Sequence, residues 1–341
     1  MAVVQMLDQT QIIEVPTDWK TELRESVTSA SELLTSLQLD PALLSDAQQA
    51  ALQFPLQVPK PYVSRIQRGN PRDPLLIQVM PTAQELNEVE GYTADPLKEG
   101  AQSPQNGIIH KYRNRLLLIV SPACAINCRY CFRRNFPYQQ HRQNRAQWQS
   151  ALNYIRQHSE LNEVIFSGGD PLLANDKFLH WLSTQISEIA HIKRLRIHTR
   201  LPIVIPSRID HHLLNWMTGS RLKPVIVMHI NHANEIDSDV EAGINRLSDQ
   251  GVKIFNQSVL LKGVNNSAKD LIALSERLYD CGINPYYLHL LDPVAGASHF
   301  NVDKKEATLI YMEMQAALPG FLLPKLVREI PGQPAKTLVT K

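Results

Sequence analysis

From about residue 105 onward, short β-rich runs alternate with longer segments of helical spacing, and this alternation limits the fold more than any other feature of the chain. The runs expected to be strands cover residues 115–120, 163–167, 194–198, 224–230, 253–261 and 286–291. The segments expected to be helices cover residues 145–158, 176–189, 209–217, 236–249, 268–278 and 304–318. Strand–helix units in series predict a parallel sheet with right-handed crossovers. Because six units occur and no Gly-x-Gly-x-x-Gly follows the first run, we expect an α/β fold, a partial (β/α)6 barrel rather than a dinucleotide-binding fold.

The chain before residue 105 lacks this alternation. Polar, Leu-rich segments at residues 19–39 and 46–56 predict helices, and a loop-rich linker follows at residues 93–107. We therefore expect residues 1–104 to form a mainly helical N-terminal region with its linker, and residues 105–341 to form the core.

Composition excludes several classes of protein. The net charge of +2 provides no basic field for binding nucleic acid. No apolar run approaches the roughly 20 residues of a membrane span. Residues 1–10 lack the basic and apolar regions of a signal peptide. Clustered reduced thiols without a targeting segment predict a cytoplasmic protein.

Three of the four cysteines lie in one short run, Cys124, Cys128 and Cys131, with the spacing C-x3-C-x2-C. One loop with this spacing can wrap a small inorganic cluster. Three ligands are fewer than the four thiolates that a closed four-iron cluster takes, so one iron would stay open to a ligand that is not a side chain. Zinc, completed by Cys281 or a histidine, is the alternative, although zinc ligands usually come as two separated pairs. An odd set of three cannot form disulfides among its members alone.

Polar residues also follow several of the expected strands. Function in barrels of parallel strands gathers at the carboxyl ends of the strands, and these residues would share that rim with the cysteine loop. They are Gly168, Gly169 and Asp170, then Arg200, His229, Asn231 and His232, and finally Gln257 and Asp292. Each has a plain structural explanation by itself, such as a turn or a hydrogen-bonded histidine. Together they indicate one site.

Two patterns resemble a known family. With Tyr130 before the last cysteine, the loop is similar to the signature of radical S-adenosylmethionine (SAM) enzymes. A wider set of segments resembles lysine 2,3-aminomutase, a radical SAM enzyme that also carries pyridoxal 5′-phosphate (PLP). These segments are residues 110–115, 121–134, 165–172, 200–208, 229–235, 256–261, 285–292 and 330–336. The resemblance covers about residues 105–341 and implies a radical SAM barrel.

The resemblance implies a role for each matching residue near the cluster and SAM. Cys124, Cys128 and Cys131 would hold a 4Fe–4S cluster whose open iron binds the methionyl amine and carboxylate of SAM. Gly168, Gly169 and Asp170 would lie along that amine, where a close backbone approach needs glycine. His229, Asn231 and Gln257 would help to hold SAM.

The resemblance also implies a second cofactor site and a substrate site. Lys336 would attach PLP and act in catalysis, although a lysine so near the C-terminus is in most chains a solvated tail. Lys111 and Arg115 would bind the PLP phosphate. Arg133 would clamp the substrate carboxylate, and Asp292 would bind a substrate ammonium. Glu329 stands where clostridial members have an Asp for the remote ammonium, so its reach is longer.

The implied function is the conversion of (S)-α-lysine to (R)-β-lysine. The short length and the run 128–138 most resemble the branch that makes β-lysine for attachment to elongation factor P by a lysyl ligase. An electron donor would be needed, and a homo-oligomer is expected. Lys111 replaces an Arg of the clostridial pattern, and the C-terminal segment with zinc-binding cysteines is not expected. The alternatives are an aminomutase for another amino acid, a radical SAM enzyme without PLP, and a non-catalytic iron–sulfur protein.

Overall fold

The computed structural model describes residues 18–138 and 143–339. Within these ranges the strands form one sheet whose spatial order follows the sequence. The strands are β1 (Ile108–Tyr112), β2 (Arg115–Ser121), β3 (Glu163–Gly168), β4 (Arg194–Thr199), β5 (Lys223–His229), β6 (Lys253–Val259), β7 (Asn284–His289), β8 (Lys325–Arg328) and β9 (Thr337–Leu338). From β2 to β8 all neighbours are parallel, whereas β1 and β9 add antiparallel strands at the two edges. The signal-peptide prediction, on residues 1–10, lies outside the described residues.

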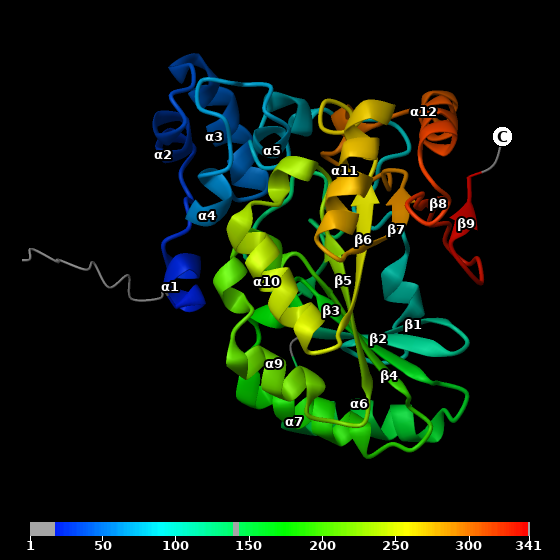
Figure 1. Ribbon diagram of the computed structural model, residues 1–341. Coiled ribbons are helices and arrows are strands. Elements are labelled where there is room, and N and C mark those ends of the chain that lie inside the picture. The colour runs from blue at the N-terminus through cyan, green and yellow to red at the C-terminus, as the bar shows by residue number, and fades with distance from the viewer. Residues whose placement is uncertain (1–17, 139–142, 340–341) are drawn as a thin grey trace, which may run out of the picture.

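Helices of the barrel follow its strands and cover the sheet, while the N-terminal helices gather beside one end of it (Figure 1). The α-helices are α1 (Trp19–Arg24), α2 (Ala30–Ser36), α3 (Leu44–Gln53), α4 (Lys60–Val63), α5 (Pro74–Ile77), α6 (Arg145–Gln157), α7 (Asp176–Ser187), α8 (Leu201–Val204), α9 (His211–Thr218), α10 (Ser238–Asp249), α11 (Ala268–Asp280) and α12 (Lys304–Ala317). Among the described residues, no helix is long and apolar enough to cross a membrane.

The six predicted strand–helix units and the α/β fold are confirmed. Two helices begin two residues later than predicted, because an aspartate caps each N-terminus. The Asp210 carboxylate accepts a hydrogen bond from the Leu213 N–H at 2.8 Å, and Asp237 accepts one from the Val240 N–H at 2.9 Å. The prediction missed β1, β8 and β9, which are short strands at the two ends of the sheet. Of these, β8 is parallel to β7 and extends the barrel by one strand.

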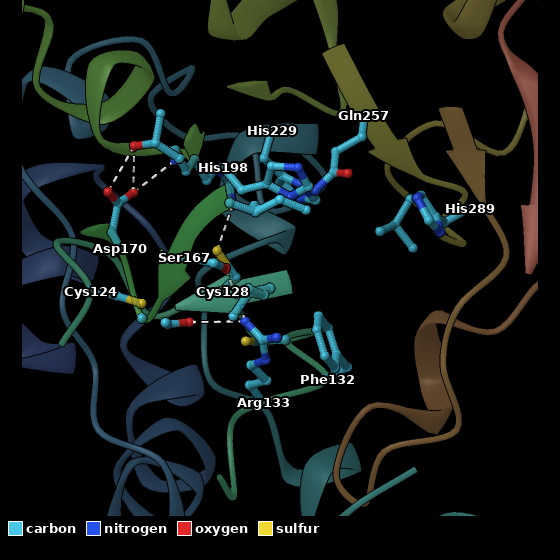
Figure 2. A pocket seen from close by; sticks show the side chains of 18 of the residues that line it. Cys124, Cys128, Phe132, Arg133, Ser167, Asp170, His198, His229, Gln257 and His289 are labelled. Carbon is cyan, nitrogen blue, oxygen red and sulfur yellow. Dashed lines mark hydrogen bonds between the residues drawn. The ribbon is translucent and has the colours of Figure 1, made fainter. Parts of the chain in front are cut away.

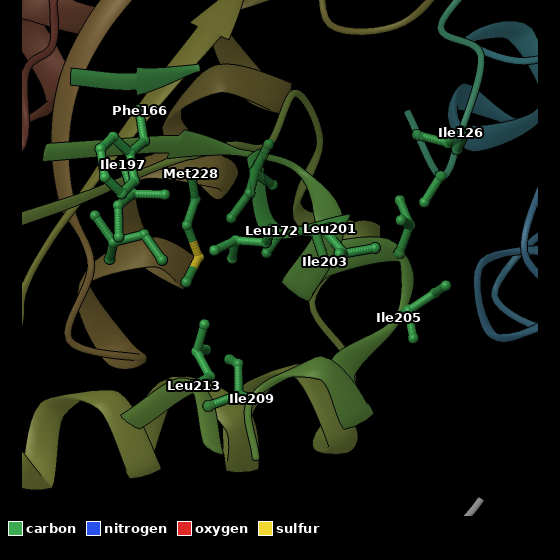
Figure 3. Close-up of a cluster of buried hydrophobic side chains, with 14 of the residues drawn as sticks. Ile126, Phe166, Leu172, Ile197, Leu201, Ile203, Ile205, Ile209, Leu213 and Met228 are labelled. Atoms are coloured by element: carbon green, nitrogen blue, oxygen red, sulfur yellow. The ribbon is translucent and has the colours of Figure 1, made fainter. Parts of the chain in front are cut away.

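Strand alternation places one set of side chains in the core and the next set in the barrel interior. On β4, for example, buried and half-buried residues alternate from Arg194 to Thr199. Phe166 of β3, Ile197 of β4 and Met228 of β5 are fully buried and lie with Leu213 of α9 in one apolar cluster (Figure 3). Their neighbours Ser167, His198 and His229 therefore face the other side of the sheet.

The N-terminal region packs against the end of the barrel that carries the cysteine loop. The Asn127 N–H donates to the Gln57 carbonyl at 3.0 Å, and the Arg129 N–H donates to the Gln78 carbonyl at 2.9 Å. One hydrophobic cluster contains residues of both parts, including Leu33 of α2. The division of the chain near residue 105 therefore remains a proposal.

Candidate active site

One cavity of about 290 Å³ opens at the carboxyl ends of the strands. The residues to which the resemblance gives a role all line it, with the single exception of Asn231. The lining residues among them are Lys111, Arg115, Cys124, Cys128, Cys131, Arg133, Gly168, Gly169, Asp170, His229, Gln257, Asp292, Glu329 and Lys336. Of the other two strand-end candidates, Arg200 lines the cavity and His232 does not; His232 instead caps the short turn that follows β5. Figure 2 shows the cysteines, Arg133 and the strand-end side chains around this space.

The cysteine loop leaves β2 and supplies three unpaired thiols to the cavity wall. Burial raises the pKa of Cys124 well above its usual value and raises the pKa of Cys131 to about 11. A metal would replace those protons, because thiolates and not thiols are the ligands. Cys281 is buried at the end of α11, outside the cavity, as expected of a small buried hydrophobe.

The thiols fit a cluster better than a single ion. In the described part of the chain, no three His, Cys, Asp or Glu side chains converge as ligands of one metal ion do. A 4Fe–4S cluster takes each thiolate on a different iron, so its ligands are spread apart. The donor set of Cys124, Cys128 and Cys131 therefore suits the predicted cluster and leaves one iron without a thiolate.

Gly168 and Gly169 pack the end of β3 directly against the start of the cysteine loop. A Cβ on Gly168 would lie 2.4 Å from the Ser121 carbonyl oxygen, and one on Gly169 would lie 2.2 Å from the Ala123 carbonyl oxygen. Gly168 also has a φ of +126°, which favours glycine. The Gly169 N–H donates to the Ser121 carbonyl at 2.8 Å. These glycines thus fix where the loop begins, in addition to any contact with SAM.

Asp170 joins the ends of β3 and β4. Its buried carboxylate accepts hydrogen bonds from the Thr199 hydroxyl at 2.7 Å and from the backbone N–H groups of Arg200 and Leu201 at 2.8 and 2.9 Å (Figure 2). Burial raises its pKa, and these hydrogen bonds oppose the rise. Because its oxygens already have protein donors, Asp170 acts through the backbone it holds; a direct contact with SAM would need one of these bonds to open.

Arg133 lines the cavity, but its guanidinium N–H groups already donate hydrogen bonds to other residues of the protein. Its Nε and Nη2 donate to the two carboxylate oxygens of Glu99 at 2.7 and 2.9 Å, and its Nη1 donates to the Ser167 hydroxyl at 3.1 Å. Lys111 lies 3.1 Å from the same Glu99 carboxylate. Burial works to raise the pKa of Glu99, but the cations outweigh it and hold the pKa at about 2. Glu99 is a site residue that the sequence did not reveal, because it begins a short 3-10 helix (Glu99–Gln102) in the linker and belongs to no recognisable motif.

Lys336 is held in the wall of the cavity by the last strands of the sheet. Pairing of β9 with β8 draws the chain end back onto the barrel, so that Lys336 lies just before β9. Its Nζ is 2.8 Å from a Glu329 carboxylate oxygen, and the Tyr112 hydroxyl donates to the other oxygen at 2.7 Å. Burial raises the pKa of Asp292 to about 7, and nearby Lys336 limits the rise. Lys336 is thus part of the cavity and not a solvated tail.

Three histidines at the strand ends line the cavity; in Figure 2 His198 and His229 lie together, and His289 lies apart from them. His198 of β4 and His289 of β7 were not predicted, although they stand at strand ends like the predicted His229. Burial lowers the pKa of each well below the usual value, and it lowers the pKa of His229 to about 3, with help from Arg200. Neutral imidazoles can donate and accept hydrogen bonds without adding charge to the site.

Asn231 lies beside the cavity and positions residues that line it. Its side-chain amide donates to the Tyr130 hydroxyl at 2.7 Å and accepts from the Val259 N–H at 2.9 Å. Tyr130 in turn lies 2.8 Å from the His229 Nε2. A direct contact between Asn231 and SAM stays a prediction.

Comparison with known proteins identifies the family. Residues 118–274 match the family described as "Radical SAM superfamily". Over 335 residues the chain is 48% identical to "L-lysine 2,3-aminomutase" of Haemophilus influenzae, which covers 98% of this chain and 99% of that protein. The chain belongs to the lysine 2,3-aminomutase family. It is 49% identical to the Escherichia coli member, over 94% of both chains, and 32% identical to the Clostridium subterminale member, over 94% of this chain and 77% of that one.

Membership of the lysine 2,3-aminomutase family confirms the predicted family and the enzyme class, an isomerase of the radical SAM superfamily. That superfamily implies a 4Fe–4S cluster and SAM, so the zinc and non-catalytic alternatives are set aside. The assignment of individual side chains to cofactors and substrate stays a proposal.

Proposed function

We propose that this chain converts (S)-α-lysine to (R)-β-lysine, using a 4Fe–4S cluster, SAM and PLP. The observation that carries the proposal is that one cavity is lined both by three cluster-type thiols and by a lysine with two carboxylates, Lys336 with Glu329 and Asp292. The names of the relatives in H. influenzae and E. coli agree with it. When bound, the cluster and SAM supply a radical that removes hydrogen from C3, and PLP supplies a π-system for moving the amino group.

The chain's own residues bind and orient these groups. Cys124, Cys128 and Cys131 would hold the cluster. Gln257 and His229, which line the same cavity, would contact SAM bound to that cluster. Asn231 would keep the Tyr130–His229 pair in position. Closing the cavity around its cofactors and substrate would exclude water and so protect a radical from side reactions.

The second cofactor would lie near Lys336, which must leave Glu329 to attach PLP. Arg115 and Lys111 line the same cavity and would bind the PLP phosphate as fixed cations. The Arg115 guanidinium lies 4.0 Å from the Tyr112 ring centroid, which orients it. As Lys336 leaves, the Glu329 carboxylate becomes available for the remote ammonium of the substrate, with Asp292 beside it in the cavity.

The substrate carboxylate would bind Arg133. Because Glu99, Ser167 and the Gly168 carbonyl engage its donors, the substrate must exchange with at least one of them. Glu99 presents the same bidentate carboxylate geometry that an amino acid would present. The exchange therefore replaces one carboxylate by another on the buried guanidinium, while the buried Glu99 keeps the Lys111 ammonium, 3.1 Å away, as its partner.

Arg133→Ala is expected to lower kcat/KM for lysine by at least about 100-fold, because losing a buried charge partner typically costs a few kcal/mol. Arg133→Lys should recover only part, since a point charge cannot form a bidentate clamp. Steady-state kinetics checks this, with exposed Arg113→Ala as the matched control. Equal kinetics in the Arg133 and Arg113 variants would contradict the assignment.

Lysine capture is expected to strengthen as pH rises through about 7. Asp292, whose pKa is raised to about 7, is neutral below that pH and binds an ammonium well only when charged. The pH profile of kcat/KM reports the free enzyme, so the value at pH 6 should be about tenfold below the plateau. Asp292→Asn should remove this step from the profile, and exposed Asp280→Asn should keep it. A step that survives Asp292→Asn belongs to another group.

We further propose that the product serves the modification of elongation factor P by a lysyl ligase, and that the protein works in the cytoplasm as a homo-oligomer with an external electron donor. Support comes from the likeness of the run 128–138 to that branch and from the identity to the E. coli member.

Anaerobic incubation with SAM, PLP, reductant and each of a panel of amino acids, followed by chromatography, tests the substrate. We expect lysine to be the preferred substrate, because Asp292 and Glu329 provide two carboxylates for its ammonium groups. Preferential turnover of an amino acid without a side-chain ammonium would favour the alternative of an aminomutase for another substrate.

A further inference from the structure

Arg200, at the end of β4, makes a contact with the cysteine loop that the proposed function does not use. Its Nη1 donates to the Cys128 Sγ at 2.7 Å and to the Tyr130 hydroxyl at 2.6 Å. The side chain lines the cavity and is only 6% exposed. Figure 2 marks a hydrogen bond at the Cys128 sulfur with a dashed line.

The guanidinium is fixed from the side opposite the sulfur. Its Nη2 donates to the Gln78 side-chain oxygen at 2.7 Å and to the Glu235 carboxylate at 2.8 Å. Glu235 is fully buried and also accepts from the Asn231 N–H at 2.8 Å. The Arg200 Nε is buried and has no partner among the described residues, so it is one more donor available to a bound group. Arg200 thus presents a rigid positive charge to one cluster ligand.

Hydrogen bonds to ligating sulfur and nearby charge are the protein's means of setting the potential of an iron–sulfur cluster. Reduction adds one electron to the cluster and makes it more negative by one charge. A donor and a cation at a ligand sulfur stabilise that reduced form more than the oxidised form. No proton is needed for the balance, because Arg200 stays charged and the electron comes from an external low-potential one-electron donor.

We infer that Arg200 is a positioning residue that raises the reduction potential of the cluster by donating to the Cys128 sulfur. This inference rests on the proposed function only in that Cys128 must be a cluster ligand. If Arg200 has this role, the reduction potential of the cluster depends on a side chain of the protein as well as on SAM at the open iron.

The experiment is an anaerobic reductive titration of the protein loaded with its iron–sulfur cluster. The EPR signal of the reduced cluster measures how much of it is reduced at each potential. At a fixed solution potential, Arg200→Gln should lower the ratio of reduced to oxidised cluster by at least tenfold, which is about 59 mV for a one-electron couple. Arg208→Gln removes another buried guanidinium, bonded to Asp176 and the Leu172 carbonyl, and serves as the matched control. Its titration should coincide with that of the original protein.

A second variant keeps the test open if Arg200→Gln fails to fold or to take up iron. Arg200→Lys keeps a charge but loses the planar fork, and about a threefold fall in the ratio is expected. An unchanged titration in a loaded Arg200→Gln or Arg200→Lys protein overturns the inference, as does an equal shift in Arg208→Gln. Failure of the original chain to bind iron would instead contradict the proposed function, so the two failures are distinguishable by iron analysis.

Discussion

Replacing Cys124, Cys128 or Cys131 by alanine is expected to abolish both the cluster and SAM cleavage. The original chain, purified anaerobically, should be brown and bind about four irons. Each of these thiols lines the cavity, and no other cysteine does, so no substitute ligand of the same type is available. Iron analysis and release of 5′-deoxyadenosine after reduction measure the two losses.

Cys281→Ala is the matched control, because the Cys281 thiol is buried at the C-terminal end of α11 and does not line the cavity. It should keep full iron content and full SAM cleavage, with a small loss of stability from the missing sulfur. Loss of the cluster in the Cys281 variant would contradict a site of three cysteine ligands.

Lys336→Ala is expected to keep the cluster and slow, uncoupled SAM cleavage but to form no measurable β-lysine. Radical formation would depend on the cluster held by the thiols, whereas amino-group movement would depend on PLP attached to Lys336. Loss of the Lys336 ammonium also leaves the Glu329 carboxylate with the Tyr112 hydroxyl alone. Borohydride treatment followed by peptide mass analysis should locate PLP on Lys336 in the original chain.

Lys325→Ala controls for the loss of a lysine on the same sheet edge, since Lys325 is exposed on β8. It should bind PLP and form β-lysine as the original chain does. If the Lys336 variant formed β-lysine at the original rate without added PLP, Lys336 would not be the attachment site. The radical SAM enzyme without PLP would then be the better description.

The fold was predictable where the sequence repeats one pattern. Six runs of β-rich residues separated by amphipathic segments are enough to specify parallel strands with helical crossovers. The short strands β8 and β9 were not predicted. They have four and two residues, and so few residues show too little alternation to distinguish a strand from a loop. β8 depends on pairing with β7, and β9 depends on pairing with β8, which are tertiary effects.

The site was predictable where a residue follows a strand or belongs to a spaced motif. Glu99 was not predicted because it belongs to the site only through its ion pairs with Lys111 and Arg133, and those pairs form in the folded chain without any local sequence pattern. His198 and His289 could have been found by noting that histidines recur at strand ends. The partners of Asp170 could not, because a carboxylate aimed at backbone N–H groups has the same sequence pattern as one aimed at a ligand.

The most direct test of the proposal that one cavity serves both cofactors is to follow hydrogen. Lysine deuterated at C3 would be incubated anaerobically with the reduced protein, SAM and PLP, and the products would be examined by mass spectrometry. The account predicts deuterium in 5′-deoxyadenosine or SAM and its return to C2 of β-lysine, with both signals lost in Lys336→Ala. Unlabelled 5′-deoxyadenosine together with unchanged lysine, in a protein loaded with iron and PLP, would contradict it.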